Sequence, residues 1–381
     1  MLTKFAVKNF KSFKNKTIVT LEKTKSAILE ATNISSDDIL KGSFFVGGNA
    51  TGKTNLILAL DFLLKILFAE NSNLLKFYRC LYIPDPVMEL EYEFLIDHSK
   101  IKFKIEYNFD QSIMKEILSI DDKEVISRLG NTGQAEIGEK KFYQDLSSEH
   151  LLTRELYFNT KFRESPLLQK WFQFLENSVY INPHKDSITC AGMVSSNLID
   201  YLNDNNVNEI NNFFQKFSFD QRIEYTKESA GKHFTIGSNV DQNLVFFKRN
   251  GSSCPIPYPL ESLGNQNMVK ILPQYLNVIK NGGMLIIDEF SSGFHNKLEE
   301  LLIKYFMENT DKAQIFVVSH STNLLSNSIF RPDQIYTVDF DINNGSNIHR
   351  VSDQKPREAQ NLEKMYLSGV FDGIPRYSDD I

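Results

Sequence analysis

The sequence predicts an α/β fold with a mixed sheet, and this expectation depends on two segments that lie far apart in the chain. Residues 43–56 read Ser-Phe-Phe-Val-Gly-Gly-Asn-Ala-Thr-Gly-Lys-Thr-Asn-Leu, and residues 283–289 read Gly-Met-Leu-Ile-Ile-Asp-Glu. The first segment indicates a buried strand, a glycine-rich loop and an apolar helix, and the second indicates a buried strand that ends in two carboxylates. Alternating residues at 3–21, 87–97 and 101–108 predict antiparallel strands beside this core.

The glycine-rich loop matches the pattern G-x-x-x-x-G-K-S/T at every fixed position. Its glycines let successive N–H groups point at phosphate oxygens, and the following helix adds the positive end of its dipole. Lys53 is expected to reach the β and γ phosphates of ATP, and Thr54 to hold Mg²⁺. The alternative is a Gly/Asn turn before a core helix, which the strand-loop-helix setting disfavours. The expected ATP-binding residues are Gly47, Gly48, Asn49, Ala50, Thr51, Gly52, Lys53, Thr54 and Asn55.

Composition excludes several classes of protein. The 381 residues carry a net charge of -6 and are 41% apolar, so they indicate a globular chain with no bulk attraction for polyanions. Three scattered cysteines indicate a reducing compartment without a disulfide framework or a structural zinc site. The apolar run at 56–69 is interrupted by Asp61 and Lys65 and is too short to span a bilayer. We therefore expect a soluble, cytoplasmic protein with no membrane partner.

The chain is expected to divide into three parts. Residues 1–109 would form the N-terminal half of an ATP-binding head, and residues 221–381 its C-terminal half. Between them, residues 110–220 are charged, with helix-like apolar spacing at 146–157, 165–175 and 206–217, and predict an inserted, mainly helical arm. Trp171 in this arm is expected in the core and not in a ligand cage.

The C-terminal half supplies the rest of the expected site. Asp288 and Glu289 end an apolar strand, where Asp288 is expected to hold Mg²⁺ and Glu289 to activate water. Paired acids also occur at ordinary strand ends, but a complete phosphate-binding loop in the same chain favours the catalytic interpretation. A second apolar strand is expected at 314–318, and His320 follows it. At the end of this strand the imidazole could contact the γ-phosphate. Ser262 and Gly264 begin a helix, which by itself indicates only an N-cap.

Together these segments resemble the ABC-type ATPase heads of SMC, RecF and RecN proteins and the overcoming-lysogenization-defect nucleases. More narrowly, the chain is similar to the AAA-labelled, ABC-like ATPases of bacterial phage-defence and abortive-infection operons, the group containing RloA, PtuA and AriA. The tail is the narrowest signal, since it is similar to a K-x-Y-L-x-G-x-F/Y-x-x-I/L-P ending of that group. The matching segments are 9–13, 47–56, 261–266, 285–295, 319–325 and 361–375.

The resemblance implies roles for individual residues. Lys53, Glu289 and His320 would take part in ATP hydrolysis, while Thr54 and Asp288 would bind Mg²⁺. Ser262 and Gly264 look like the signature loop that contacts the nucleotide of a second subunit, so two heads would enclose two ATP molecules. Lys11 would be an additional phosphate contact.

The chain departs from the usual pattern of such heads in three places. The signature reads Ser-Leu-Gly-Asn-Gln at 262–266, Ser291 stands where an acidic residue often occurs, and Asn296 replaces a common proline. No glutamine occurs between Asn55 and Gln111, so the loop that usually supplies a magnesium-linked glutamine is not located. These departures leave the metal coordination and the coupling between heads open.

The resemblance implies a homodimeric or larger ATPase that acts as the sensor or regulatory subunit of an anti-phage defence system. Because the chain shows no nuclease-like acidic cluster, the effector, expected to be a nuclease, would be a separate polypeptide. The trigger could be a nucleic acid or a phage protein. An alternative is a RecF- or SMC-like DNA-binding ATPase in DNA repair or maintenance. A third hypothesis is a small-molecule kinase.

Overall fold

The computed structural model describes residues 1–69, 75–148, 150–192, 198–226, 245–291 and 294–374. A seven-stranded sheet forms the centre of the fold, in the order β11-β10-β15-β16-β3-β17-β18. The five inner strands are parallel, and the two edge strands run antiparallel to their neighbours. The carboxyl ends of the parallel strands therefore meet at one edge. The strands are β3 (Gly42–Gly47), β10 (Val179–Asn182), β11 (Ser187–Cys190), β15 (Gly283–Ile287), β16 (Ala313–Val318), β17 (Ile335–Asp341) and β18 (Gly345–Arg350).

A second sheet has eight antiparallel strands in the order β2-β1-β4-β5-β6-β7-β8-β9. It contains the expected hairpin, in which β4 pairs with β5 along its full length. The strands of this sheet are β1 (Leu2–Lys8), β2 (Thr17–Thr20), β4 (Val87–Ile96), β5 (Ser99–Asn108), β6 (Ile113–Ile120), β7 (Lys123–Leu129), β8 (Thr132–Ile137) and β9 (Glu139–Tyr143).

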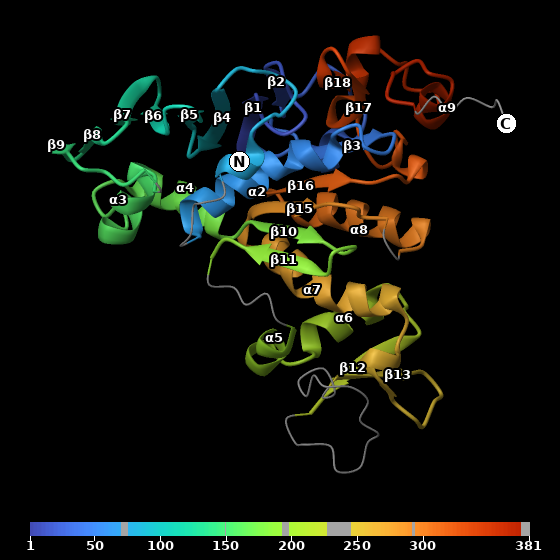
Figure 1. The fold of residues 1–381 in the computed structure, drawn as a ribbon. Coiled ribbons are helices and arrows are strands. Elements are labelled where there is room, and N and C mark those ends of the chain that lie inside the picture. Colours follow the sequence, from blue (N-terminus) through green and yellow to red (C-terminus); the bar gives the residue numbers. More distant parts are fainter. Residues whose placement is uncertain (70–74, 149, 193–197, 227–244, 292–293, 375–381) are drawn as a thin grey trace.

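Helix α2 (Lys53–Phe68) lies between the two sheets (Figure 1). It is apolar nearly all round, as expected for a helix that is covered on both sides. Its carbonyl at Ala59 accepts a hydrogen bond of 2.7 Å from the hydroxyl of Tyr92 on β4. Because α2 starts directly after the glycine-rich loop, this burial fixes the loop against the central sheet.

The other helices cover the remaining faces. Helix α4 (Pro166–Glu176) packs on β15 and β4, while α7 (Leu263–Asn281) contacts β15, β10 and β16. A lower lobe combines α5 (Leu198–Asn205), α6 (Asn208–Lys216) and a small sheet of β12 (Gln221–Tyr225), β13 (Val245–Arg249) and β14 (Ile256–Pro257) (Figure 1). The others are α1 (Glu30–Asn33), α3 (Leu152–Thr160), α8 (Asn296–Asn309) and α9 (Leu362–Leu367). Within the described ranges, no helix has the length and apolar character needed to cross a membrane.

The expectation of an inserted, mainly helical arm over 110–220 is wrong in part, because this range holds strands β6 to β11 as well as helices α3 to α6. Strands β6 to β9 extend the eight-stranded sheet, and β10 pairs with β15 inside the central sheet. The period-two pattern was hidden because two inward positions carry charged residues, Glu116 and Arg128. The carboxylate of Glu116 accepts hydrogen bonds from the N–H groups of Leu152 and Thr153 at the start of α3, so its burial is compensated. Trp171 is fully buried, as expected for a core residue.

Candidate functional site

The phosphate loop, residues 47–54, joins the end of β3 to the start of α2. Ala50 and Gly52 have positive φ angles of 62° and 112°, a backbone alternation that turns amide N–H groups toward one concave side. A Cβ atom at Gly52 would lie 2.2 Å from Oγ of Ser346, so only glycine fits there. The hydroxyl of Ser346 also donates to the carbonyl of Thr51 at 2.6 Å. The loop is therefore held in shape from behind by β18.

Lys53 is the buried cation of this loop. Its Nζ donates to the carbonyls of Gly47 and Gly48, at 3.0 and 2.6 Å. Burial lowers the pKa of the Lys53 ammonium, whereas the nearby charges of Glu289 and Asp288 raise it. The Lys53 ammonium therefore lies within the phosphate loop, close to where a bound phosphate would lie.

Asp288 and Thr54, predicted as the metal ligands, meet at the carboxyl edge of the sheet. Oγ1 of Thr54 donates to Oδ1 of Asp288 at 3.0 Å. The other carboxylate oxygen accepts from the amide of Asn182 at 3.0 Å and from the hydroxyl of Tyr180 at 3.2 Å. Burial raises the pKa of Asp288, while the hydrogen bond from Thr54 lowers it. The buried Asp288 carboxylate is therefore held by hydrogen bonds in a position next to the Thr54 hydroxyl.

The donor set suits Mg²⁺. Magnesium prefers hard oxygen ligands and usually keeps one or two protein oxygens together with phosphate oxygens and water. Thr54 and Asp288 supply two such oxygens beside the phosphate loop. In the described parts of the chain, no group of three or more His, Cys, Asp and Glu side chains could form a cage around a metal ion. A magnesium ion at this position would be held by Thr54 and Asp288.

Glu289 and His320 face each other at the ends of β15 and β16. Oε2 of Glu289 lies 3.8 Å from Nε2 of His320, and both side chains are partly exposed. Glu289 has a positive φ of 55°, which is uncommon for a residue with a Cβ and is often found at functional sites. Burial lowers the pKa of His320, and the Lys53 charge lowers it further. The structure thus gathers Lys53, Asp288, Glu289 and His320 around one position.

Lys11 lies on the turn between β1 and β2. Its backbone N–H donates to the carbonyl of Tyr78 at 2.7 Å, and its Nζ is 4.8 Å from the centre of the Tyr78 ring. Burial lowers the pKa of Lys11, and the charge of Lys185 lowers it further. The neighbouring Ser12 accepts a hydrogen bond from Asn55 in the first turn of α2. The predicted phosphate contact is therefore tied to the phosphate loop through the adjacent residue.

Ser262 and Gly264 lie at the surface, at the start of α7. Ser262 is the N-cap of this helix, since its Oγ accepts from the N–H of Asn265 at 3.4 Å. Because α7 runs into β15 through a short turn at Gly282, its start points toward the carboxyl edge of the sheet. In the described residues, neither Ser262 nor Gly264 forms a hydrogen bond with the phosphate loop.

The segment at 261–266, expected to be the signature, is held by hydrogen bonds and an ion pair of its side chains. Asn265 and Gln221 exchange two hydrogen bonds of 3.0 and 3.1 Å, which join α7 to β12. Gln266 donates to the carbonyl of Glu261 at 2.7 Å, and Glu261 forms an ion pair with Arg249. Leu263 beside the N-cap is 65% exposed. The segment thus presents a fixed helix start and an apolar side chain to solvent.

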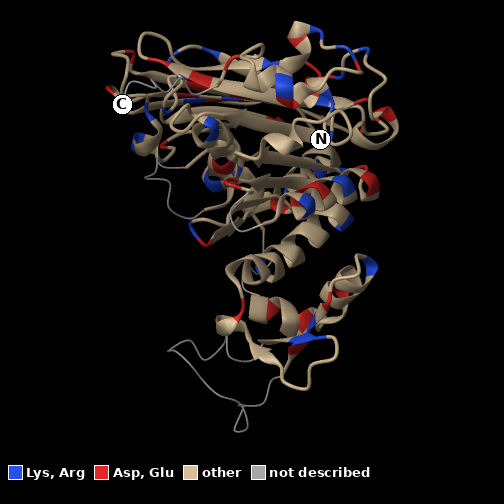
Figure 2. Ribbon diagram, turned by 90° about the vertical axis from the view of Figure 1, so that its right-hand side faces the viewer, with Lys and Arg blue, Asp and Glu red and all other residues tan. Residues whose placement is uncertain are grey.

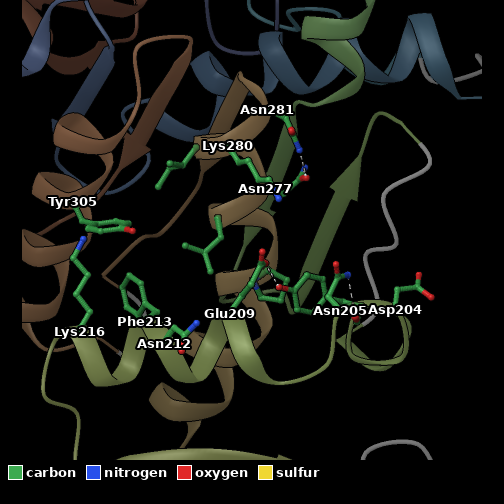
Figure 3. Close-up of a pocket in the computed structure, with 14 residues that line it drawn as sticks. Asp204, Asn205, Glu209, Asn212, Phe213, Lys216, Asn277, Lys280, Asn281 and Tyr305 are labelled. Carbon is green, nitrogen blue, oxygen red and sulfur yellow. Dashed lines mark hydrogen bonds between the residues drawn. The ribbon is translucent and has the colours of Figure 1, made fainter.

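A hollow of about 570 Å³ lies in the lower lobe, between α5, α6 and α7 (Figure 3). Phe213, Leu276 and Tyr305 give it apolar walls, and Lys216 and Lys280 lie at its rim. It contains none of the residues of the phosphate loop or of the strand ends that carry Asp288 and His320. It is therefore not part of the candidate site.

Sequence reasoning missed four residues that shape the site: Ser12, Tyr180, Asn182 and Ser346. Tyr180 and Asn182 lie on β10, in the segment that was expected to belong to the arm. The short apolar run at 179–182, followed directly by Pro183, was a signal for a buried strand with a polar end. Ser12 lies in the turn between β1 and β2 and Ser346 in β18, and neither gave such a signal because single serines are common at such places.

Comparisons with known proteins agree with this arrangement. A family model described as "AAA domain, putative AbiEii toxin, Type IV TA system" matches residues 43–326. No curated protein sequence matches the chain. The matched range contains the phosphate loop, the signature segment, Asp288, Glu289 and His320.

Three solved SMC heads are similar over most of the chain. The SMC head domain from Thermotoga maritima has 16% identity and a TM-score of 0.46, with 91% of this chain and 97% of that chain covered. An SMC head bound to the C-winged helix domain of ScpA has 13% identity and a TM-score of 0.48, with 91% and 97% covered. A head with an extended coiled coil bound to the C-terminal domain of ScpA, from Pyrococcus furiosus, has 12% identity and a TM-score of 0.47, with 91% and 95% covered.

The fold expected from the sequence, an α/β P-loop head with a mixed sheet, is confirmed. Since the family match extends over well more than half of the residues, this chain belongs to the AAA-domain family that the matching model describes.

Proposed function

We propose that this protein binds and hydrolyses ATP with Mg²⁺, and that ATP joins two copies of the chain. The observation that carries the proposal is the convergence of Lys53, Thr54 and Asp288 at one edge of the central sheet. A phosphate loop, a carboxylate held at 3.0 Å from its threonine and a neighbouring acid form the arrangement that phosphoryl transfer to water requires.

Each side chain has a distinct task in this proposal. Lys53 leaves the carbonyls of Gly47 and Gly48 and binds the terminal phosphates, which offer a full negative charge in place of two dipoles. Glu289 orients the attacking water and accepts its proton, while neutral His320 donates a hydrogen bond to the γ-phosphate. A bound Mg²⁺ would neutralise charge on the phosphate oxygens beside Thr54 and Asp288.

Pairing of two copies is supported by the exposure of Ser262 and Leu263, which leaves the start of α7 accessible to a second molecule. The exposed start of α7 carries the partial positive charge of a long helix, which favours contact with a phosphate. Ser262 and Gly264 of one copy would contact the γ-phosphate held by Lys53 of the other. The 65% exposed side chain of Leu263 would be covered by the same contact.

The biological role we propose is that of sensor and regulatory subunit in an anti-phage defence system, which controls a separate effector, a nuclease. The support is the family match, whose description names a toxin of the AbiEii kind and a toxin–antitoxin system. Assembly of two heads around ATP would provide the two states that such control needs.

The alternative is an ATPase that grips DNA, which requires a face rich in unpaired cations. The outer face of the eight-stranded sheet instead carries lysines paired with glutamates of neighbouring strands. Figure 2 shows acidic and basic residues interspersed over the molecule. These pairs leave little attraction for a polyanion on that face, so we favour the sensor role. The pairs include Lys4–Glu93, Lys8–Glu89, Lys16–Glu91, Lys100–Glu93 and Lys104–Glu106.

The decisive experiment uses Glu289→Gln in the full chain. Removing the base should slow ATP hydrolysis by at least about a hundredfold, while ATP affinity stays within about twofold. Light scattering with ATP and Mg²⁺ should then show a stable pair of copies. Glu300→Gln on α8 is a matched control and should hydrolyse ATP at the parental rate. If Glu289→Gln hydrolyses ATP as fast as the parental protein, the assignment of the base is wrong.

A further inference from the structure

The C-terminal segment at 358–374, here called the strap, is the part of the sequence that the proposed ATPase cycle does not use. It crosses the surface from the loop behind His320 to the phosphate loop. Its own side chains Leu362, Tyr366 and Phe371 are buried, so the strap packs on the head. Helix α9 in the strap ends at Leu367, and Gly369 follows its C-cap with a positive φ of 83°, which allows the chain to turn back toward β17.

One end of the strap holds the segment that follows His320. The hydroxyl of Thr322, two residues after this histidine, donates to Oε1 of Glu363 at 2.6 Å. The side-chain amide of Asn327 donates to the carbonyl of Glu358 at 2.8 Å. These bonds join the strap to the short helix η4 (Thr322–Leu324) and to Asn327, both of which follow His320 in the chain.

The other end of the strap holds the phosphate loop. The carbonyl of Gly373 accepts a hydrogen bond from the backbone N–H of Gly48 at 3.1 Å and another from the hydroxyl of Tyr366, also at 3.1 Å. Between the two ends, Oγ1 of Thr337 on β17 donates to the carbonyl of Phe371 at 2.5 Å. One residue, Tyr366 of α9, thus reaches the carbonyl that contacts the phosphate loop.

We propose that the strap couples the phosphate loop to the His320 loop, so that a change at Gly48 on nucleotide binding alters the position of His320. The path runs from Gly48 through Gly373 and Tyr366 along α9 to Glu363 and Thr322. Glu363 and Tyr366 are therefore positioning residues, which act on the site through other groups. The inference rests on the proposed function, because it needs a nucleotide at the phosphate loop.

The test is hydrogen exchange in the full chain, with and without a non-hydrolysable ATP analogue. In the parental protein the analogue should increase protection of residues 46–54 and also of residues 319–327. Tyr366→Phe and Glu363→Ala each remove one hydrogen bond of the path. They should keep the response at 46–54 and reduce the response at 319–327 by about two- to tenfold in exchange rate.

Three further variants separate coupling from simple loss of structure. Glu358→Ala, on the strap but using only its carbonyl, is the matched control and should behave as the parental protein. Glu363→Gln should restore the response, since its amide oxygen can accept from Thr322. If Glu363→Ala does not fold, Thr322→Val tests the same bond from the other side.

The outcomes distinguish the two proposals. Normal responses of both segments in Tyr366→Phe and Glu363→Ala would overturn the coupling while leaving nucleotide binding intact. If the parental protein shows no response at 46–54, nucleotide binding itself fails. A loss of both responses in Tyr366→Phe, with an unchanged melting temperature, would also contradict the coupling, because it would show that Tyr366 serves only the shape of the phosphate loop.

Discussion

Nε2 of His320 lies 3.8 Å from Oε2 of Glu289, and this approach joins the ends of two neighbouring parallel strands. It is fixed by the backbone, because the N–H of Phe290 donates to the carbonyl of Val318 at 2.9 Å. The same imidazole is influenced by Lys53, which lowers its pKa after the larger effect of burial. The pKa of His320 therefore depends on both the proposed base, Glu289, and the proposed phosphate-binding cation, Lys53.

The first prediction concerns the protonation of His320 in the nucleotide-free protein. Its pKa should lie below the usual value of about 6.5. Lys53→Met should raise this pKa, since it removes a repulsive cation, whereas Glu289→Gln should lower it further. An NMR titration of the imidazole measures all three values. A higher pKa in Glu289→Gln than in the parental protein would contradict the geometry described here.

The sign of the effect on stability follows from the same shift. A histidine whose folded pKa lies below its unfolded value of about 6.5 binds fewer protons when folded. The contribution of His320 to folding is therefore fully present above pH 6.5 and decreases as the pH falls through the window between the unfolded and the folded pKa. His320→Gln should remove this part of the acid sensitivity, as pH-dependent thermal denaturation would show.

Asn182 provides a prediction that sequence reasoning alone did not offer. Its amide donates to Asp288 at 3.0 Å and orients the carboxylate toward Thr54. Groups that orient a metal ligand typically change metal affinity by about ten- to a hundredfold when removed. Asn182→Ala should therefore raise the Mg²⁺ concentration needed for half-maximal ATP hydrolysis by about tenfold or more. Asn177→Ala, before the same strand, is the control, and equal Mg²⁺ dependence in the two variants would exclude this role.

The central fold was predictable because its strands and helix carry continuous apolar sequence. The strand at 43–46 and the helix at 54–68 correspond to β3 and α2, and the strand at 283–287 is β15. The strands in the segment 110–220 were not predictable, because the charged residues Glu116 and Arg128 occupy inward positions of β6 and β7. Glu116 accepts hydrogen bonds from the backbone at 152–153, and Arg128 donates to carbonyls at 147 and 150, a tertiary effect that no local pattern contains.

The candidate site was predictable where residues follow one another in a motif. The pairing of Thr54 with Asp288 followed from two motifs that the parallel sheet brings to one edge. The contacts of Asn182 and Ser346 did not, since both depend on which strands become neighbours in the sheet. The pattern of the tail indicates only a family resemblance. The hydrogen bond between Gly373 and Gly48 is seen only in the structure.

Lys53→Ala is predicted to weaken ATP binding by at least about a hundredfold, because charge-assisted hydrogen bonds to phosphate are among the strong ones. Binding of a fluorescent ATP analogue at constant Mg²⁺ measures the effect. Lys280→Ala, on the far end of α7, removes the same charge away from the loop and should bind ATP normally. Comparable losses of affinity in both variants would mean that general charge, and not the phosphate loop, governs binding.

The last prediction concerns pairing. Ser262→Arg places a bulky cation at the exposed start of α7, where the second copy would approach. One chain should still bind ATP with parental affinity, because Ser262 forms no hydrogen bond with its own phosphate loop among the described residues. In a Glu289→Gln background, light scattering with ATP and Mg²⁺ should then show single chains instead of pairs. Ser262→Asn is the matched control, since asparagine also serves as an N-cap and should leave pairing intact. Full pairing of Ser262→Arg would place the contact between copies elsewhere on the head.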